Sequence, residues 1–187
     1  MNLAKSMDKD YRRLKNYFHK KFELMKIAFT EDETAPIAAE DADADESQAT
    51  YHGFSHLIKP DMLMNTYSYW EFWANKLCDY QGRKRNLPQA CKRIKGKSDL
   101  DVYHEYLTEY VGIDLSSVQD SRDRVDDLRR VRNSLMHHGG HISDEQKSEY
   151  SSIEGISITF SLLTIEDAFI WSTLDHAKEY LHAAAIA

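Results

Sequence analysis

The chain has 187 residues, of which 42% are hydrophobic, and this is enough to bury the core of one domain. Its two cysteines, Cys78 and Cys91, are too few for a disulfide framework and lack the spacing of a zinc or redox pair. No stretch approaches the ~18 apolar residues of a membrane span, and the N-terminus has no apolar signal segment, so we expect a soluble, cytoplasmic protein without a membrane partner.

The first predicted element is an amphipathic helix over about residues 5–29. Its apolar side chains recur every three or four residues and should face the core. They are Tyr11, Leu14, Phe18, Phe22, Met25 and Phe29. Residues 31–50 then contain eight carboxylates and no Lys or Arg, and they lack any apolar periodicity. We expect an acidic, flexible insert there, within one helical domain that spans residues 1–187.

A second helix is predicted from about Pro60 to Tyr80, with the proline in its first turn. Aromatic side chains nearly surround it and indicate deep burial, although a platform on which bases stack is an alternative. Residues 83–97 follow with seven basic side chains and no acidic one. This segment could track a phosphate backbone or form a solvated loop. The candidate RNA-binding residues are Arg83, Lys84, Arg85, Lys92, Arg93 and Lys95.

Two further helices are predicted in the middle of the chain. The first follows Ser98, which gives a partial capping signal together with Asp101, and it stops before Gly112. The second begins near Ser121 and ends at a Gly-Gly pair. Its apolar stripe consists of Val125, Leu128, Val131 and Leu135.

The C-terminal part combines a strand signal with a last helix. Alternating apolar residues from Gly155 to Phe160 predict a short strand or hairpin arm. The last helix is expected over about residues 164–184, because residues 164–167 read as a capping box. The predicted fold class is therefore all-α, an antiparallel bundle of about five helices with a small β-hairpin before the last one.

The run from Arg129 to His141 holds three arginines, one asparagine and three histidines. An arginine can grip a phosphate with two hydrogen bonds, and a histidine can transfer protons near neutral pH, so the run indicates phosphodiester chemistry. One alternative is that these side chains only stabilise the C-terminus of their helix. Another is a zinc site, which lacks a completing ligand. It would use His137, His138 and His141.

At these residues the chain resembles the HEPN superfamily of small helical domains. Its signature is an arginine, usually followed by a polar residue, with a histidine after four to six intervening positions near the end of a helix. Here Asn133 follows Arg132, and four residues separate Arg132 from His137. His138 satisfies the pattern with five. The resemblance covers about Tyr51 to Ala184.

The resemblance implies a homodimer in which two copies of the motif helix form a composite site that cleaves RNA without a metal or other cofactor. Arg132 would bind the scissile phosphate, His137 would act as general base or acid, and Asn133 would position a phosphate oxygen. Three side chains are auxiliary candidates: His138, Arg130 and Arg129. Many relatives are toxins held by an antitoxin such as a nucleotidyltransferase, or phage-defence effectors. The alternative is a catalytically inactive HEPN-like module that mediates dimerisation and protein or nucleotide binding.

Overall fold

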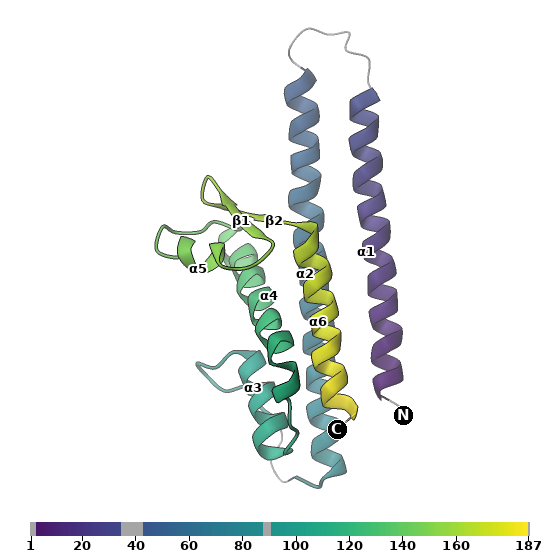
Figure 1. Ribbon diagram of the computed structural model, residues 1–187, viewed down its shortest axis with the longest axis vertical. Helices are drawn as coiled ribbons and strands as arrows, with labels where there is room; N and C mark the ends of the chain where they lie inside the picture. The colour runs from purple at the N-terminus through teal and green to yellow at the C-terminus, as the bar shows by residue number, and fades with distance from the viewer. Residues whose placement is uncertain (1–2, 35–42, 88–90, 187) are drawn as a thin grey trace.

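Four long helices packed side by side form the body of the protein (Figure 1). The structure is a computed structural model that describes residues 3–34, 43–87 and 91–186. Helices α1 (Leu3–Thr34) and α2 (Asp43–Lys84) run antiparallel, and α4 (Gln119–His138) and α6 (Asp167–Ile186) complete the bundle. The shorter helical elements are α3 (Asp99–Glu105), the π-helical turn η1 (Tyr106–Tyr110), the 3-10 turn η2 (Ser116–Val118) and α5 (Lys147–Ser151). The fold is all-α, as predicted.

The core is centred on α6, which contacts α1, α2 and α4. Trp70 of α2 and Tyr180 of α6 are fully buried, and their ring centroids lie 6.4 Å apart. Phe18 of α1 and Phe169 of α6 are also fully buried. The aromatic residues on the inner face of α2 are therefore core residues, whereas Phe72 on its outer face is 52% exposed. Burial of these rings removes apolar area from water and so stabilises the bundle.

The first two helices extend further than the sequence pattern predicts. α1 continues to Thr34, and α2 begins at Asp43 instead of near Pro60, so the helices include residues 31–34 and 43–50 of the expected acidic insert. Residues 35–42 of that insert lie outside the described residues. The loop prediction is therefore wrong over the helical parts. The sequence pattern identifies helices by their apolar periodicity, and residues 31–50 have none.

The connection from α2 to α4 begins with the capped helix that the sequence predicts. The Ser98 side chain accepts a hydrogen bond of 3.1 Å from the backbone N–H of Asp101, which satisfies one of the unpaired donors at the start of α3. The helix then widens into η1 and ends before Gly112, whose φ is +76°. Positive φ is costly for residues with a Cβ, so the glycine allows the chain to turn toward η2 and α4.

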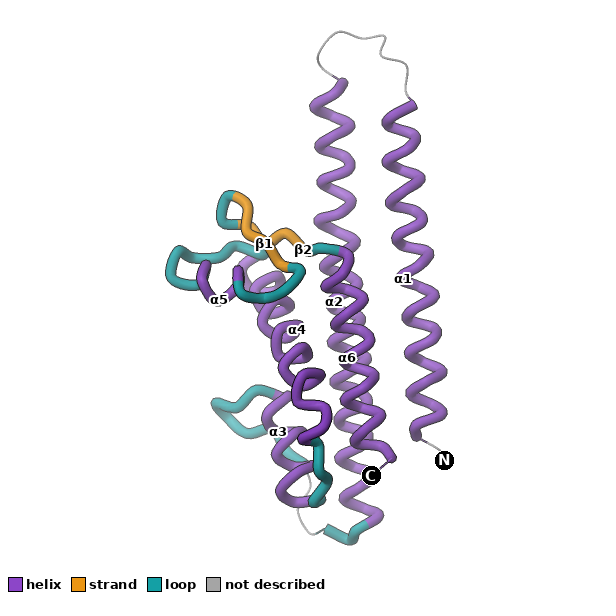
Figure 2. Tube along the Cα trace, in the orientation of Figure 1, coloured by secondary structure: helices purple, strands orange, loops and turns teal. Residues whose placement is uncertain are grey.

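A two-stranded antiparallel hairpin, β1 (Ile156–Thr159) and β2 (Leu162–Ile165), precedes the last helix (Figure 2). This confirms the predicted hairpin. The predicted start of the last helix at Thr164 is wrong, because Thr164 lies in β2 opposite Ser157 and α6 begins at Asp167. Thr164 pairs with β1 instead of capping the helix, so the local capping signal is overridden. The sequence around Thr164 does not show this pairing.

Candidate functional site

The motif run lies at the C-terminal end of α4, where the predicted glycines stop the helix. Gly139 adopts a left-handed conformation with φ of +59°, and the N–H of Gly140 donates to the Ser134 carbonyl at 3.1 Å. The N–H of Gly139 donates to the same carbonyl, so the two glycines satisfy an acceptor in the last turn of α4. The Gly140 carbonyl then accepts from the Leu163 N–H at 2.9 Å. The end of the motif helix is thus fixed to the β-hairpin by backbone hydrogen bonds.

Arg132 is held on the side of α4 that faces α2. Its guanidinium carbon lies 5.2 Å from the centroid of the Tyr67 ring, and its Nη1 donates to Asn133 Oδ1 at 2.9 Å. The side chain is half-buried. A cation over an aromatic face and a neutral amide orient the guanidinium, and no ion pair with a described residue compensates its positive charge.

The other arginines of α4 are engaged in ion pairs. Of the five arginines in α4, four have a carboxylate within 4.0 Å. The pairs are Arg122 with Asp101, Arg124 with Asp127, Arg129 with Asp126, and Arg130 with Asp126, Asp127 and Glu149. Among the described residues no carboxylate lies within this distance of Arg132. Arg129 and Arg130, which the sequence nominates as auxiliary, are therefore bound to acidic side chains of the protein itself.

Arg130 also joins α4 to α5. Its Nη1 lies 3.0 Å from a Glu149 carboxylate oxygen, and its backbone carbonyl accepts a hydrogen bond of 3.2 Å from the Tyr150 hydroxyl. On the same side chain, Nη2 lies 2.6 Å from Asp127. Burial raises the pKa of the Asp127 carboxyl, and the neighbouring Arg130 and Arg124 oppose that rise. Arg130 thus has a structural role in this fold.

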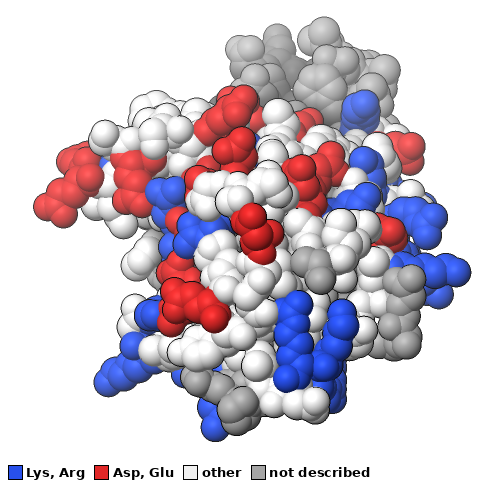
Figure 3. Space-filling view, turned by 60° about the horizontal axis from the view of Figure 1, so that its bottom comes forward, with Lys and Arg blue, Asp and Glu red and all other residues white. Residues whose placement is uncertain are grey.

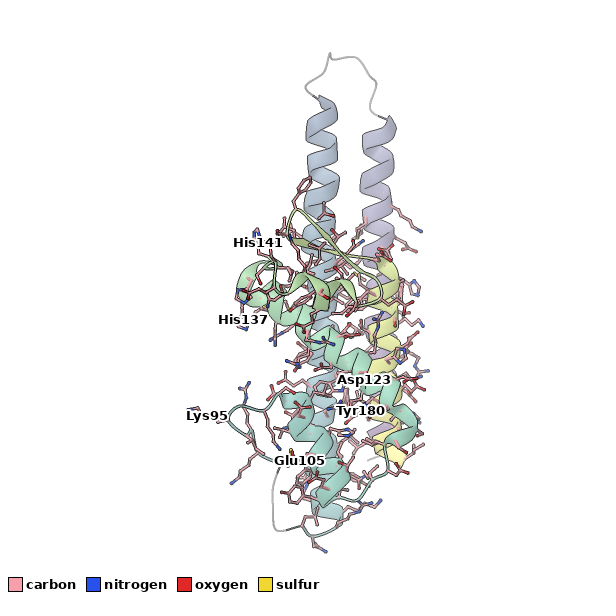
Figure 4. All side chains as sticks on the ribbon, turned by 60° about the vertical axis from the view of Figure 1, so that its left-hand side comes forward. Lys95, Glu105, Asp123, His137, His141 and Tyr180 are labelled. Carbon is pink, nitrogen blue, oxygen red and sulfur yellow. The ribbon has the colours of Figure 1, made fainter. Side chains whose placement is uncertain are left out.

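The three histidines of the run are exposed at the same end of α4. Figure 4 shows His137 and His141 projecting outward, away from the helical body. The rings of His137 and His138 lie 6.5 Å apart in an edge-to-face arrangement. Within the described ranges no group of three or more His, Cys, Asp or Glu side chains is placed to hold a metal ion. The histidines are accessible to a molecule that approaches this end of the bundle.

Arg132 and His137 leave α4 on different faces. His137 lies five positions after Arg132, which places their side chains about 140° apart around an α-helix. Arg132 faces Tyr67 of α2, whereas His137 is exposed at the end of α4. In the described part of the chain no hydrogen bond connects the two side chains. Within a single chain, Arg132 and His137 therefore do not form one site.

The contact with Tyr67 and a neighbouring carboxyl, Glu71, are parts of this site that sequence reasoning missed. Burial raises the pKa of Glu71, and Asp99 raises it further, while Arg132 and Arg93 lower it. Glu71 therefore lies within electrostatic range of Arg132 without forming an ion pair. The available signal was the spacing of Tyr67 and Glu71, which puts both on one face of α2. The contact of that face with α4 is not visible in the sequence.

The basic segment is only partly available to a ligand. Arg85 donates to the Val111 carbonyl, Arg93 pairs with Asp99 at 3.2 Å, and Lys97 pairs with Glu105. The remaining basic side chains are exposed and have no ion pair within the described ranges. They are Arg83, Lys84, Lys92 and Lys95. On the face shown in Figure 3, basic and acidic side chains are interspersed. Figure 4 places Lys95 apart from His137 along the bundle.

Comparison with known proteins found no similar protein. No family model, no curated protein and no solved structure matches this chain. Among the described helices none is both long and apolar enough to cross a membrane. The functional inference therefore depends on the geometry around α4.

Proposed function

We propose that the chain is a metal-independent endoribonuclease of HEPN type, in which Arg132 binds the scissile phosphate and His137 transfers protons at a site shared by two copies of the chain. One observation carries this proposal: Arg132 is oriented by Tyr67 and Asn133, yet it has no carboxylate partner in the described structure. An oriented arginine without a counter-ion is suited to bind the anionic phosphate of RNA.

The reaction that suits these groups is attack of a ribose 2'-hydroxyl on the adjacent phosphate. The imidazole of His137 removes the 2'-hydroxyl proton while the oxygen bonds to phosphorus. The bond from phosphorus to the 5'-oxygen breaks, and that oxygen takes up a proton from a histidine or from water. Arg132 stabilises the negative charge that builds on the non-bridging oxygens. The products carry a 2',3'-cyclic phosphate and a 5'-hydroxyl.

A second copy of the chain would bring an arginine and a histidine to the same phosphate. Because Arg132 and His137 point about 140° apart on one helix, they cannot easily reach one phosphate from the same chain. A two-fold dimer with α4 at its interface would bring Arg132 of one copy across from His137 of the other. The exposure of His137 at the end of α4 supports such an arrangement.

The test is cleavage of a mixed-sequence RNA in EDTA by the wild type, Arg132→Ala and His137→Ala. We expect cleavage with 2',3'-cyclic phosphate ends by the wild type and a loss of at least about 100-fold in each variant, as is typical for removal of an acid-base group or a charge-stabilising donor. His141→Ala is the matched control, because this histidine is exposed at the same end of α4 but lies outside the motif spacing, and it should retain activity.

The same variants distinguish the enzyme from an inactive dimerisation module. An enzyme keeps its dimer in sedimentation or light scattering when Arg132 or His137 is replaced. A module that uses α4 only as a dimer seam loses association in these variants, and its wild type does not cleave RNA. His138→Ala also tests the alternative spacing, since it should remain active if His137 is the catalytic histidine.

A further inference from the structure

A cavity of about 280 Å³ lies beside the motif, where α2, the end of α4 and β2 meet. Its walls are mainly apolar. The lining residues are Lys59 and Pro60 of α2, Leu135 and the two glycines that end α4, and Leu162 to Ile165 of β2. This volume falls just below the ~300–1,000 Å³ of pockets for drug-sized ligands, so it suits one small, flat group.

The cavity has a polar edge as well as apolar walls. β2 pairs with β1 on one side, and its outer side faces the turn after α4. There the Leu163 N–H donates to the Gly140 carbonyl, and the Ile142 N–H donates to the carbonyl of Ser161, just before β2. Beyond Leu163 no strand of the described structure pairs with this outer edge. The lysine of the cavity, Lys59, caps the far end by donating to the Ile165 carbonyl at 2.8 Å. A strand edge offers backbone donors and acceptors to a ligand.

The cavity lies on the same α2–α4 face as Arg132. Along this face, Arg132 contacts Tyr67, and further toward the end of α4 the cavity brings Leu135 and Gly139 to Pro60. Leu135 follows Arg132 by three residues and Gly139 by seven, which is a rise of about 5 to 10 Å along the helix. A group bound in the cavity would therefore lie about 5 to 10 Å further along the axis of α4 than Arg132.

We propose that this cavity is a nucleobase-binding subsite for the RNA strand whose phosphate is bound by Arg132. A nucleobase has apolar faces that match the apolar walls of the cavity, and its edge of hydrogen-bond donors and acceptors suits the polar part of the lining, Lys59 and Thr164. The subsite rests on the proposed ribonuclease function, since Arg132 defines the phosphate position. It makes β2 and the turn after α4 determinants of which base stands next to the cleaved bond.

Binding of mononucleotides tests the subsite without any cleavage. The four ribonucleosides and their 5'-monophosphates are titrated one at a time into the wild type and followed by NMR or calorimetry. We expect at least one nucleoside to bind, with shifts in the backbone resonances of β2, and its monophosphate to bind more tightly. Arg132→Ala should abolish the gain from the phosphate and leave nucleoside binding unchanged.

Two tryptophan variants, one at a residue that lines the cavity and one outside the lining, test whether filling the cavity weakens binding. Thr164→Trp places a large ring at the cavity, whereas Ser157→Trp changes the exposed residue directly opposite on β1, outside the cavity lining. We expect Thr164→Trp to weaken nucleoside binding at least about tenfold, the loss typical of an apolar pocket contact, and Ser157→Trp to leave it unchanged. Thermal unfolding of both variants establishes that they are folded.

The outcomes separate the two proposals. If no nucleoside binds, or if Thr164→Trp and Ser157→Trp bind alike, the subsite is refuted, even when Arg132-dependent RNA cleavage is observed. If nucleosides bind in the cavity but the wild type cleaves no RNA, the subsite is supported as a nucleoside site and the ribonuclease proposal fails.

Discussion

Replacing Arg130 and Arg132 one at a time should distinguish the arginine that stabilises the fold from the arginine that is needed for RNA cleavage. The Arg130 guanidinium lies within 4.0 Å of three carboxylates, on Asp126, Asp127 and Glu149, and it links α4 to α5. Arg132 has no such partner in the described structure and contacts an aromatic ring and an amide instead. We therefore expect Arg130→Ala to destabilise the fold and to preserve cleavage. Arg132→Ala should abolish cleavage with only a small loss of stability.

The expected changes in the free energy of unfolding follow from how far the paired side chains are buried. The Arg130 side chain is 29% exposed and Asp127 is 20% exposed, whereas Glu149 is 50% exposed and contributes least. Exposed pairs contribute ~0.2–1 kcal/mol each, and a carboxylate left half-buried costs more. Arg130→Ala should therefore lower the free energy of unfolding by about 2 kcal/mol. Arg132→Ala loses one cation–π contact, worth about 0.5–1 kcal/mol.

Urea unfolding at one fixed protein concentration measures both changes, because the stability of a dimer depends on concentration. Cleavage is then assayed well below the unfolding midpoint of each variant. The reasoning would be refuted if Arg132→Ala cost as much stability as Arg130→Ala. It would also fail if folded Arg130→Ala lost cleavage to the same extent as Arg132→Ala.

Three further predictions concern the rest of the fold. Gly155→Ala should cost at least about 2 kcal/mol in urea unfolding, since φ is +79° and the added Cβ would lie 3.2 Å from the Phe169 backbone nitrogen; a cost below about 0.5 kcal/mol would contradict this close packing. Burial lowers the pKa of His104 below its ordinary 6.5, so the unfolded chain binds the proton more tightly. Stability should therefore fall as the pH decreases below about 6.5, and a His104→Gln variant that shows the same slope would rule this out. A hydrogen bond from the Cys78 thiol lowers the pKa of Cys91, and iodoacetamide should modify Cys91 in the native protein and buried Cys78 only after unfolding, as peptide mass spectrometry would show.

The sequence predicts those parts of the fold that depend on local patterns. The apolar stripe of Val125, Leu128 and Val131 is fully buried in α4, and the Ser98 cap forms as expected. The start of α2 and the strand at Thr164 were predicted wrongly. Residues 43–50 at the start of α2 have no apolar periodicity to indicate a helix, and strand pairing depends on residues outside the local window.

The candidate site was predictable in its residue types but not in its contacts. The spacing of Arg132 and His137 is visible in the sequence, as is their position on different faces of one helix. That Arg130 also pairs with Glu149 of α5, and that Arg132 lies over Tyr67 of α2, depends on how separate elements pack. These long-range contacts distinguish the arginine suited to a phosphate from its structural neighbour.

The most direct test of a shared ribonuclease site is to mix Arg132→Ala with His137→Ala, after each has been found inactive alone. Heterodimers then contain one intact site, with Arg132 from one chain and His137 from the other. With complete exchange, half of the dimers carry one site of two, so we predict recovery of about a quarter of wild-type cleavage in EDTA. Differently tagged chains establish that exchange has occurred. Exchanged dimers that still do not cleave RNA would contradict the shared site.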